Sequence, residues 1–228
     1  MTLESQDYGF MGLPVRGFQI AIFVLLVQNI LLFLSGIGVF FIEKALNPDN
    51  PTGLFNISFI ASLYLDIIGF FLLAIFSLLL ALKSQEASSM ILIVIGSAIF
   101  IIASLAWRPI MGFMPENPLS STFGALLLSD IQPRTGQLFD FSSIEKIIRA
   151  LIISNSGLAV ISIGFSMLVL PERKDLRNYT LAYGALNIFL TISVFFVILK
   201  ILITPLLILP ALRYMVSNEF LITLETSY

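Results

Sequence analysis

The chain has no cysteine and no histidine among its 228 residues. Without cysteine it has no disulfides, no thiolate chemistry and no cysteine ligands for iron–sulfur clusters. Without histidine it lacks the commonest ligand of zinc and haem and the usual general base of a serine nucleophile. We therefore expect no bound metal and no cofactor, and we expect that the protein is not an enzyme.

Charge is also scarce, because charged residues make up only 11% of the chain. The 12 basic and 14 acidic residues leave a formal net charge of −2. No run of lysine and arginine is long enough to indicate binding to nucleic acid or to a strongly anionic membrane surface. Nucleic acid is therefore not an expected partner.

Apolar residues, by contrast, make up 58% of the chain, and its mean hydropathy is +1.01. A soluble globule could not cover such a composition with polar surface. Long apolar runs extend over Phe18–Phe41, Ile57–Leu82, Ser88–Trp107, Ile147–Leu170 and Thr180–Leu212. Each run is long enough to cross a bilayer as a helix, and none alternates as a barrel strand would. The sequence predicts an all-α, multi-pass integral membrane protein with about five transmembrane helices in a single domain, residues 1–228.

The connections between these runs carry further expectations. The turn Lys83–Glu86 makes the second and third spans an antiparallel hairpin, and residues 108–143 form a longer, apolar loop expected to pack on the helices or on a partner. The fifth run is unusually long, so Pro205 and Pro210 are expected to bend its end or turn it into an interfacial segment. The density of basic residues in short loops favours a cytoplasmic amino terminus.

Small and polar residues recur at helical spacing inside the spans. The second span carries Ser58, Ser62, Asp66, Gly69 and Ser77, the fourth carries Asn155, Ala159, Ser162 and Ser166, and the fifth carries Gly184, Asn187 and Thr191. Lipid cannot satisfy a polar group, so these faces should turn towards one another. Close helix packing with amide hydrogen bonds explains most of them.

Asp66 is the residue that packing alone does not explain. It lies about 13 Å along its helix from Ile57, well inside the bilayer core, so an ionised carboxylate there needs a cationic partner. The basic residues at helix ends on the same side are Arg108, Lys146, Arg149 and Lys200. Arg149 or Lys200 is the predicted partner, and the candidate intramembrane polar site comprises Asp66, Arg149, Lys200, Asn155 and Asn187. Without a partner, the unfavourable burial of charge would keep the acid protonated, as a proton or cation site.

Two functional interpretations follow. The shortage of reactive side chains and the apolar loop favour a non-catalytic accessory or structural subunit of a larger membrane complex, with membrane lipids and other membrane subunits as partners. The alternative is a small transporter or channel component that uses Asp66 as a proton or cation site. A lipid-modifying enzyme would need acidic or polar residues gathered at one interface, which the sequence does not show.

Overall fold

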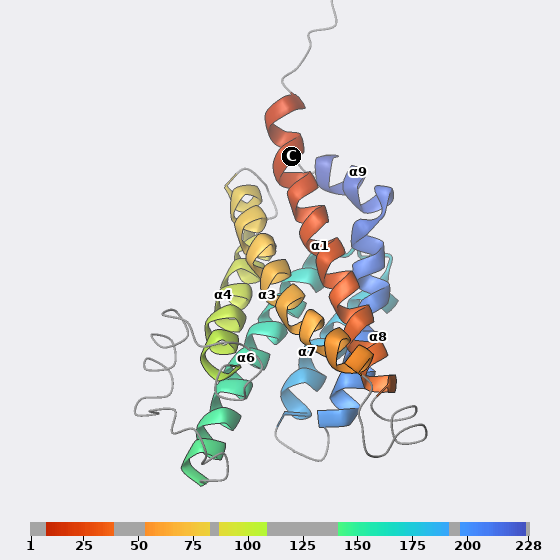
Figure 1. Ribbon diagram of the computed structural model, residues 1–228. Coiled ribbons are helices and arrows are strands. Elements are labelled where there is room, and N and C mark those ends of the chain that lie inside the picture. Colours follow the sequence, from red (N-terminus) through yellow and green to blue (C-terminus); the bar gives the residue numbers. More distant parts are fainter. Residues whose placement is uncertain (1–7, 39–52, 83–86, 109–140, 192–196, 227–228) are drawn as a thin grey trace, which may run out of the picture.

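The computed structural model describes residues 8–38, 53–82, 87–108, 141–191 and 197–226, and these residues form helices and their connections (Figure 1). The helices are α1 (Tyr8–Ile37), α3 (Gly53–Ala81), α4 (Ala87–Trp107), α6 (Phe141–Leu168), α7 (Lys174–Phe189), α8 (Val197–Val216) and α9 (Asn218–Thr226). Five of them, α1, α3, α4, α6 and α8, are long and apolar enough to cross a membrane. The prediction of a multi-pass, all-α membrane protein is therefore confirmed.

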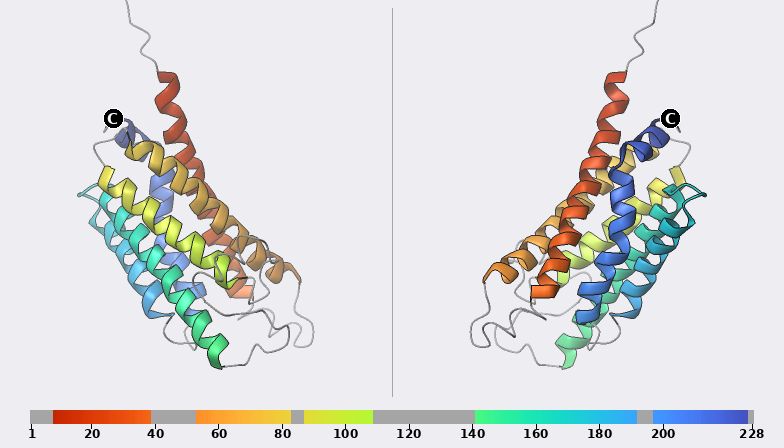
Figure 2. Two further views of the ribbon diagram at one scale, coloured as in Figure 1. Left: turned by 90° about the vertical axis from the view of Figure 1, so that its left-hand side faces the viewer. Right: turned by 90° about the vertical axis from the view of Figure 1, so that its right-hand side faces the viewer.

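Three helices begin several residues before the predicted spans: α1 by ten residues, α3 by four and α6 by six. Helix α1 begins ten residues before the predicted Phe18. Its first turns precede the apolar run and project past the neighbouring helices (Figure 2). Helix α6 begins at Phe141, so residues 141–143 of the predicted loop 108–143 belong to this helix. Apart from these and Arg108, that loop lies outside the described residues.

The fifth predicted run, 180–212, is two helices instead of one. Helix α7 ends in a tight turn in which the Leu190 N–H donates to Leu186 O and the Thr191 N–H to Ile188 O. The chain then reverses, and α7 lies antiparallel to both α6 and α8 (Figures 1 and 2). With 16 residues, α7 is about 24 Å long, short of the length required of a span but close to it.

The two prolines of the predicted fifth span both lie inside α8. The helix continues past Pro205 and Pro210 to Val216, so these residues do not convert its end into a separate interfacial segment. The short helix α9 follows and folds back towards α1. Its Phe220 is buried against Phe18 and Tyr214, with ring centroids 6.4 and 5.6 Å apart.

The six long helices close into a ring. Each packs against the helix before it and the helix after it in the chain, and α8 packs against α1. The connection at residues 83–86 makes α3 and α4 antiparallel neighbours, as the sequence predicts. Large apolar side chains such as Phe18, Leu73 and Met90 fill the contacts between the helices.

Glycine allows the backbones of α4 and α6 to touch. A Cβ atom added to Gly96 would meet the Gly157 carbonyl oxygen at 2.6 Å, and one added to Gly157 would meet the Gly96 oxygen at the same distance. Between α6 and α7, a Cβ atom at Gly184 would overlap the Ser162 hydroxyl. The predicted small-residue faces of α6 and α7 therefore do meet, because only small residues allow the backbones to approach so closely.

Candidate functional site

The acid inside the second membrane helix, Asp66, forms a buried ion pair with Arg108. Arg108 Nη1 donates to Asp66 Oδ1 at 2.8 Å, and Nη2 donates to Oδ2 at 2.6 Å. The Asp66 side chain is only 9% exposed, and the Arg108 side chain only 2%. Such a two-bond arrangement fixes both side chains, because the planar guanidinium matches the two carboxylate oxygens. The pair joins the middle of α3 to the residue that follows α4.

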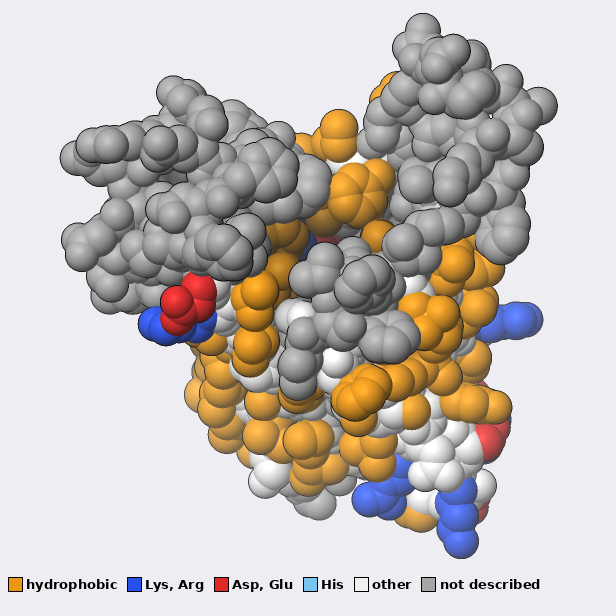
Figure 3. Space-filling view, turned by 90° about the horizontal axis from the view of Figure 1, so that it is seen from below, with side chains coloured by type: hydrophobic (Ala, Val, Ile, Leu, Met, Phe, Trp, Pro, Cys, Tyr) orange, Lys and Arg blue, Asp and Glu red, His pale blue; other side chains and the backbone are white. Residues whose placement is uncertain are grey.

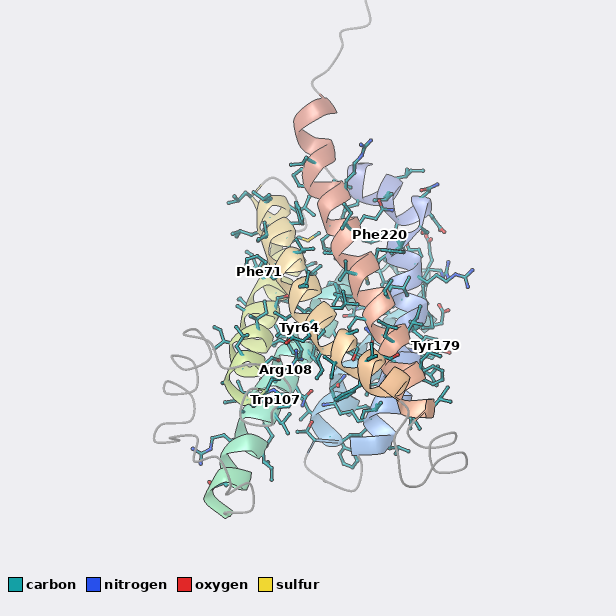
Figure 4. All side chains as sticks on the ribbon, viewed as in Figure 1. Tyr64, Phe71, Trp107, Arg108, Tyr179 and Phe220 are labelled. Carbon is teal, nitrogen blue, oxygen red and sulfur yellow. The ribbon has the colours of Figure 1, made fainter. Side chains whose placement is uncertain are left out.

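The surroundings of Arg108 hold it in this position (Figure 4). Its Nη1 also donates to the backbone oxygen of Leu63, one turn before Asp66 on α3. The guanidinium carbon lies 5.7 Å from the ring centroid of Phe100 and 5.6 Å from that of Trp107, within range of cation–π attraction. Its Nε has no hydrogen-bond partner among the described residues. The arginine is therefore fastened to α3 at three oxygen atoms and packed against aromatic rings of α4.

The predicted partners of Asp66, Arg149 and Lys200, are both wrong. Arg149 lies on the outer surface, where it pairs with Glu145 one turn earlier at 2.8 Å; these side chains are 63% and 70% exposed. Lys200 lies near the start of α8 and bonds to neutral groups of α6 and of the α7 end. Neither residue forms an ion pair with Asp66.

The hairpin between α3 and α4 contains the signal that would have identified Arg108. A four-residue connection makes the two helices antiparallel neighbours, so Asp66 lies opposite the last two turns of α4. Helical side chains tilt towards the amino terminus of their helix, and a long arginine just past the end of α4 can therefore reach back to that level. This register distinguishes Arg108 from Arg149 and Lys200, two other basic residues at helix ends on the same side.

Lys200, Asn155 and Asn187, predicted as members of one site, belong to a second polar cluster between α6, α7 and α8. Lys200 Nζ donates to Asn155 Oδ1 at 2.6 Å and to Thr191 Oγ1 at 3.2 Å. Asn155 Nδ2 donates to Thr191 Oγ1 and to Leu151 O, both at 2.7 Å. The Thr191 hydroxyl donates to Asn187 O at 2.6 Å. The structure thus joins Asn155 to Lys200 directly, and Asn187 through its backbone.

Asp66 and the second cluster do not share a hydrogen bond among the described residues. The buried Tyr183 lies within electrostatic range of Asp66, and Asn187, one turn later on α7, donates to the Tyr183 backbone oxygen at 2.8 Å. Seen from the end at which α8 begins, apolar side chains cover most of the described surface, and a small charged area shows in a recess near its centre (Figure 3). The polar groups therefore gather inside the helix ring, away from the lipid-facing surface.

The described residues contain no group of acidic side chains that could hold a metal ion. The carboxylate of Asp66 is already bound by Arg108 at both oxygens. No family model, no curated protein and no solved structure matches the chain significantly. Function therefore has to be argued from the geometry of these two clusters.

Proposed function

We propose that this protein is a non-catalytic structural subunit of a larger membrane protein assembly. The observation that carries this proposal is the enclosed pair of Asp66 and Arg108. In a membrane, an ionisable residue marks a functional path when it faces water or a substrate. Here both carboxylate oxygens are occupied by the guanidinium, and the two side chains are nearly inaccessible. Asp66, the one acid within the five described spans, thus joins two helices.

A continuous apolar stripe on α3 offers a surface on which other membrane subunits could pack. Its exposed residues recur every three or four positions: Ile57, Ile60, Tyr64, Ile68, Phe71, Ile75, Leu78 and Leu82. This spacing puts them on one face of the helix. The face includes the aromatic side chains of Tyr64 and Phe71, and rings of this kind are common in protein contacts. In the proposed assembly, α3 meets a neighbouring subunit.

Photocrosslinking from two adjacent phenylalanines tests this proposal. Phe71 is 56% exposed, whereas Phe70 is 6% exposed and packs on Phe100 with ring centroids 4.5 Å apart. We would replace each in turn with p-benzoylphenylalanine and irradiate cells that make the protein in its native membrane. The Phe71 variant should form a product with a second membrane polypeptide, and the Phe70 variant should not. Products with lipid alone at Phe71 would count against α3 as the contact face.

The alternative is a transporter or channel component in which Asp66 carries a proton or cation. The polar groups that extend from Tyr183 through Asn187 and Thr191 to Lys200 inside the ring support it. That mechanism requires Asp66 to separate from Arg108 in each transport cycle. The separation costs free energy, because it breaks two hydrogen bonds and a buried ion pair. Reconstituted vesicles test it: Asp66→Asn should abolish proton-dependent flux when equal amounts of folded protein are compared. Unchanged flux would exclude Asp66 as the carrier.

A further inference from the structure

Helix α8 contains two prolines inside its membrane span, and they lie on different sides of the helix. The span runs from Leu199 to Val216. Pro205 is buried in the ring, whereas Pro210 is exposed. Proline has no backbone N–H, so the helical hydrogen bond that residue 210 would donate to Leu206 O cannot form. A backbone carbonyl in this part of α8 therefore lacks its helical donor.

This carbonyl lies on the outward face of α8, near the middle of the span. The Leu206 side chain is 49% exposed, and Pro210 follows one turn later on the same face. Helix α8 lies between α1 and α7 at the edge of the ring, as the right-hand view of Figure 2 shows. The hydrocarbon core contains no water that could bond to the carbonyl, so an unmet acceptor at this depth is unfavourable.

The described chain does not supply the missing donor. Thr204 has the nearest hydroxyl along α8, but it is buried and donates to Lys200 O at 2.6 Å. No other side chain among the described residues donates to Leu206 O. A shift of the Leu209 N–H to Leu206 O would only transfer the deficit to Pro205 O, its own helical acceptor. The stretch is therefore short of one donor in either arrangement.

We propose that this face of α8 binds a transmembrane helix of a partner subunit, and that a hydroxyl or amide side chain of that helix donates to Leu206 O. The face is apolar, with one acceptor and no donor, so an apolar helix with one donor complements it. Lipid acyl chains match the apolar surface but have no donor. The inference rests on the structural function proposed above and adds a second contact face, since α1 separates α8 from α3 in the ring.

Photocrosslinking from two similarly exposed residues tests the position of this contact. Leu206 is 49% exposed, and Ile95, on α4 across the ring, is 47% exposed. Each would be replaced with p-benzoylphenylalanine in cells that make the protein in its native membrane. The Leu206 variant should form a product with a second membrane polypeptide, and the Ile95 variant should form products with lipid. Peptide mapping should place a serine, threonine, asparagine or glutamine in the linked segment.

Pro210→Ala tests the acceptor itself, because alanine restores the N–H that Leu206 O lacks. At equal amounts of folded protein, this change should reduce the yield of the Leu206 product by about 2- to 10-fold, as expected for the loss of one hydrogen bond. Replacing the mapped donor of the partner should reduce the yield similarly, but should not reduce it further in Pro210→Ala. The purified chain alone should gain Tm in Pro210→Ala, whereas a proline needed only for folding would make it lose Tm.

The outcomes separate this inference from the proposed function. Products with lipid alone at Leu206, from a chain that still elutes with larger membrane proteins, would overturn the inference and leave the function intact. Elution of the chain by itself would overturn both. A product with a second copy of this chain, a linked segment without a side-chain donor, or an unchanged yield in Pro210→Ala would each overturn the inference as well.

Discussion

Removing one member of the Asp66–Arg108 pair should destabilise the protein strongly, whereas removing both should not. Asp66→Leu leaves the Arg108 guanidinium, which is 2% exposed, without its counter-charge. Arg108→Met leaves the Asp66 carboxylate, which is 9% exposed, without its counter-charge. Breaking a buried pair from one side typically lowers the free energy of unfolding by about 3–5 kcal/mol. In the double variant, apolar groups of similar volume pack together, and most of that loss should be recovered. The expected coupling energy is therefore about 3 kcal/mol or more.

The exposed pair Glu145–Arg149 provides a matched control for this double-mutant cycle. It has the same charges and a similar distance of 2.8 Å, but its side chains are 63–70% exposed. Exposed pairs spaced four residues apart on a helix contribute about 0.3–0.5 kcal/mol. Trp107 is the only tryptophan and lies beside Arg108, so its fluorescence can follow reversible unfolding in detergent.

Equal coupling in the two pairs would refute the reasoning, since the buried pair has two hydrogen bonds and joins two helices away from water, whereas the exposed pair has one hydrogen bond within α6. Cycles that combine Asp66→Leu with changes at Arg149 or Lys200 should show no coupling beyond experimental error. Strong coupling to either residue would mean that the carboxylate has a different partner from the one described.

Two further predictions concern packing and topology. Gly96→Ala should lower the free energy of unfolding by about 1–3 kcal/mol, because its new Cβ would meet the Gly157 backbone. Gly12→Ala is the control: its new Cβ would meet no atom within 4 Å, so this variant should be neutral or more stable by up to about 1 kcal/mol. Chemical denaturation of both variants under the same conditions checks this, and equal losses would contradict the described α4–α6 contact. Because the chain has no cysteine, single cysteines at Lys174 and Asn218 can be labelled with an impermeant maleimide without a background thiol. If α7 and α8 both cross the membrane, the two positions are labelled from the same side; labelling from opposite sides would mean that only one of them crosses.

Apolar periodicity could predict the helices, but not where one apolar run becomes two helices. Residues 180–212 contain no strong polar break, so hydropathy alone merges α7 with α8. The separation depends on the tight turn at Leu190 and Thr191 and on the packing of α7 between α6 and α8. These are tertiary contacts, which a local pattern does not contain.

The candidate site was predictable in part. The position of Asp66 inside a span requires a cationic partner, and that expectation holds because the physics of burial is independent of the fold. The identity of the partner depends on which helix ends reach the level of Asp66 and on which side of its helix each cation lies. Arg149 has suitable chemistry but an outward position, whereas Arg108 reaches back along α4.

The central claim, that this chain is a structural subunit, is tested most directly by extracting it from its native membrane in mild detergent. Size-exclusion chromatography would be followed by mass spectrometry of every polypeptide that elutes with it. We predict that a fixed stoichiometric set of larger membrane proteins elutes with the chain. The same set should elute with the Glu145→Ala variant, which changes only an exposed side chain. Elution as a lone monomer or homo-oligomer from gently solubilised membranes would contradict the claim and favour transport through the polar groups inside the ring.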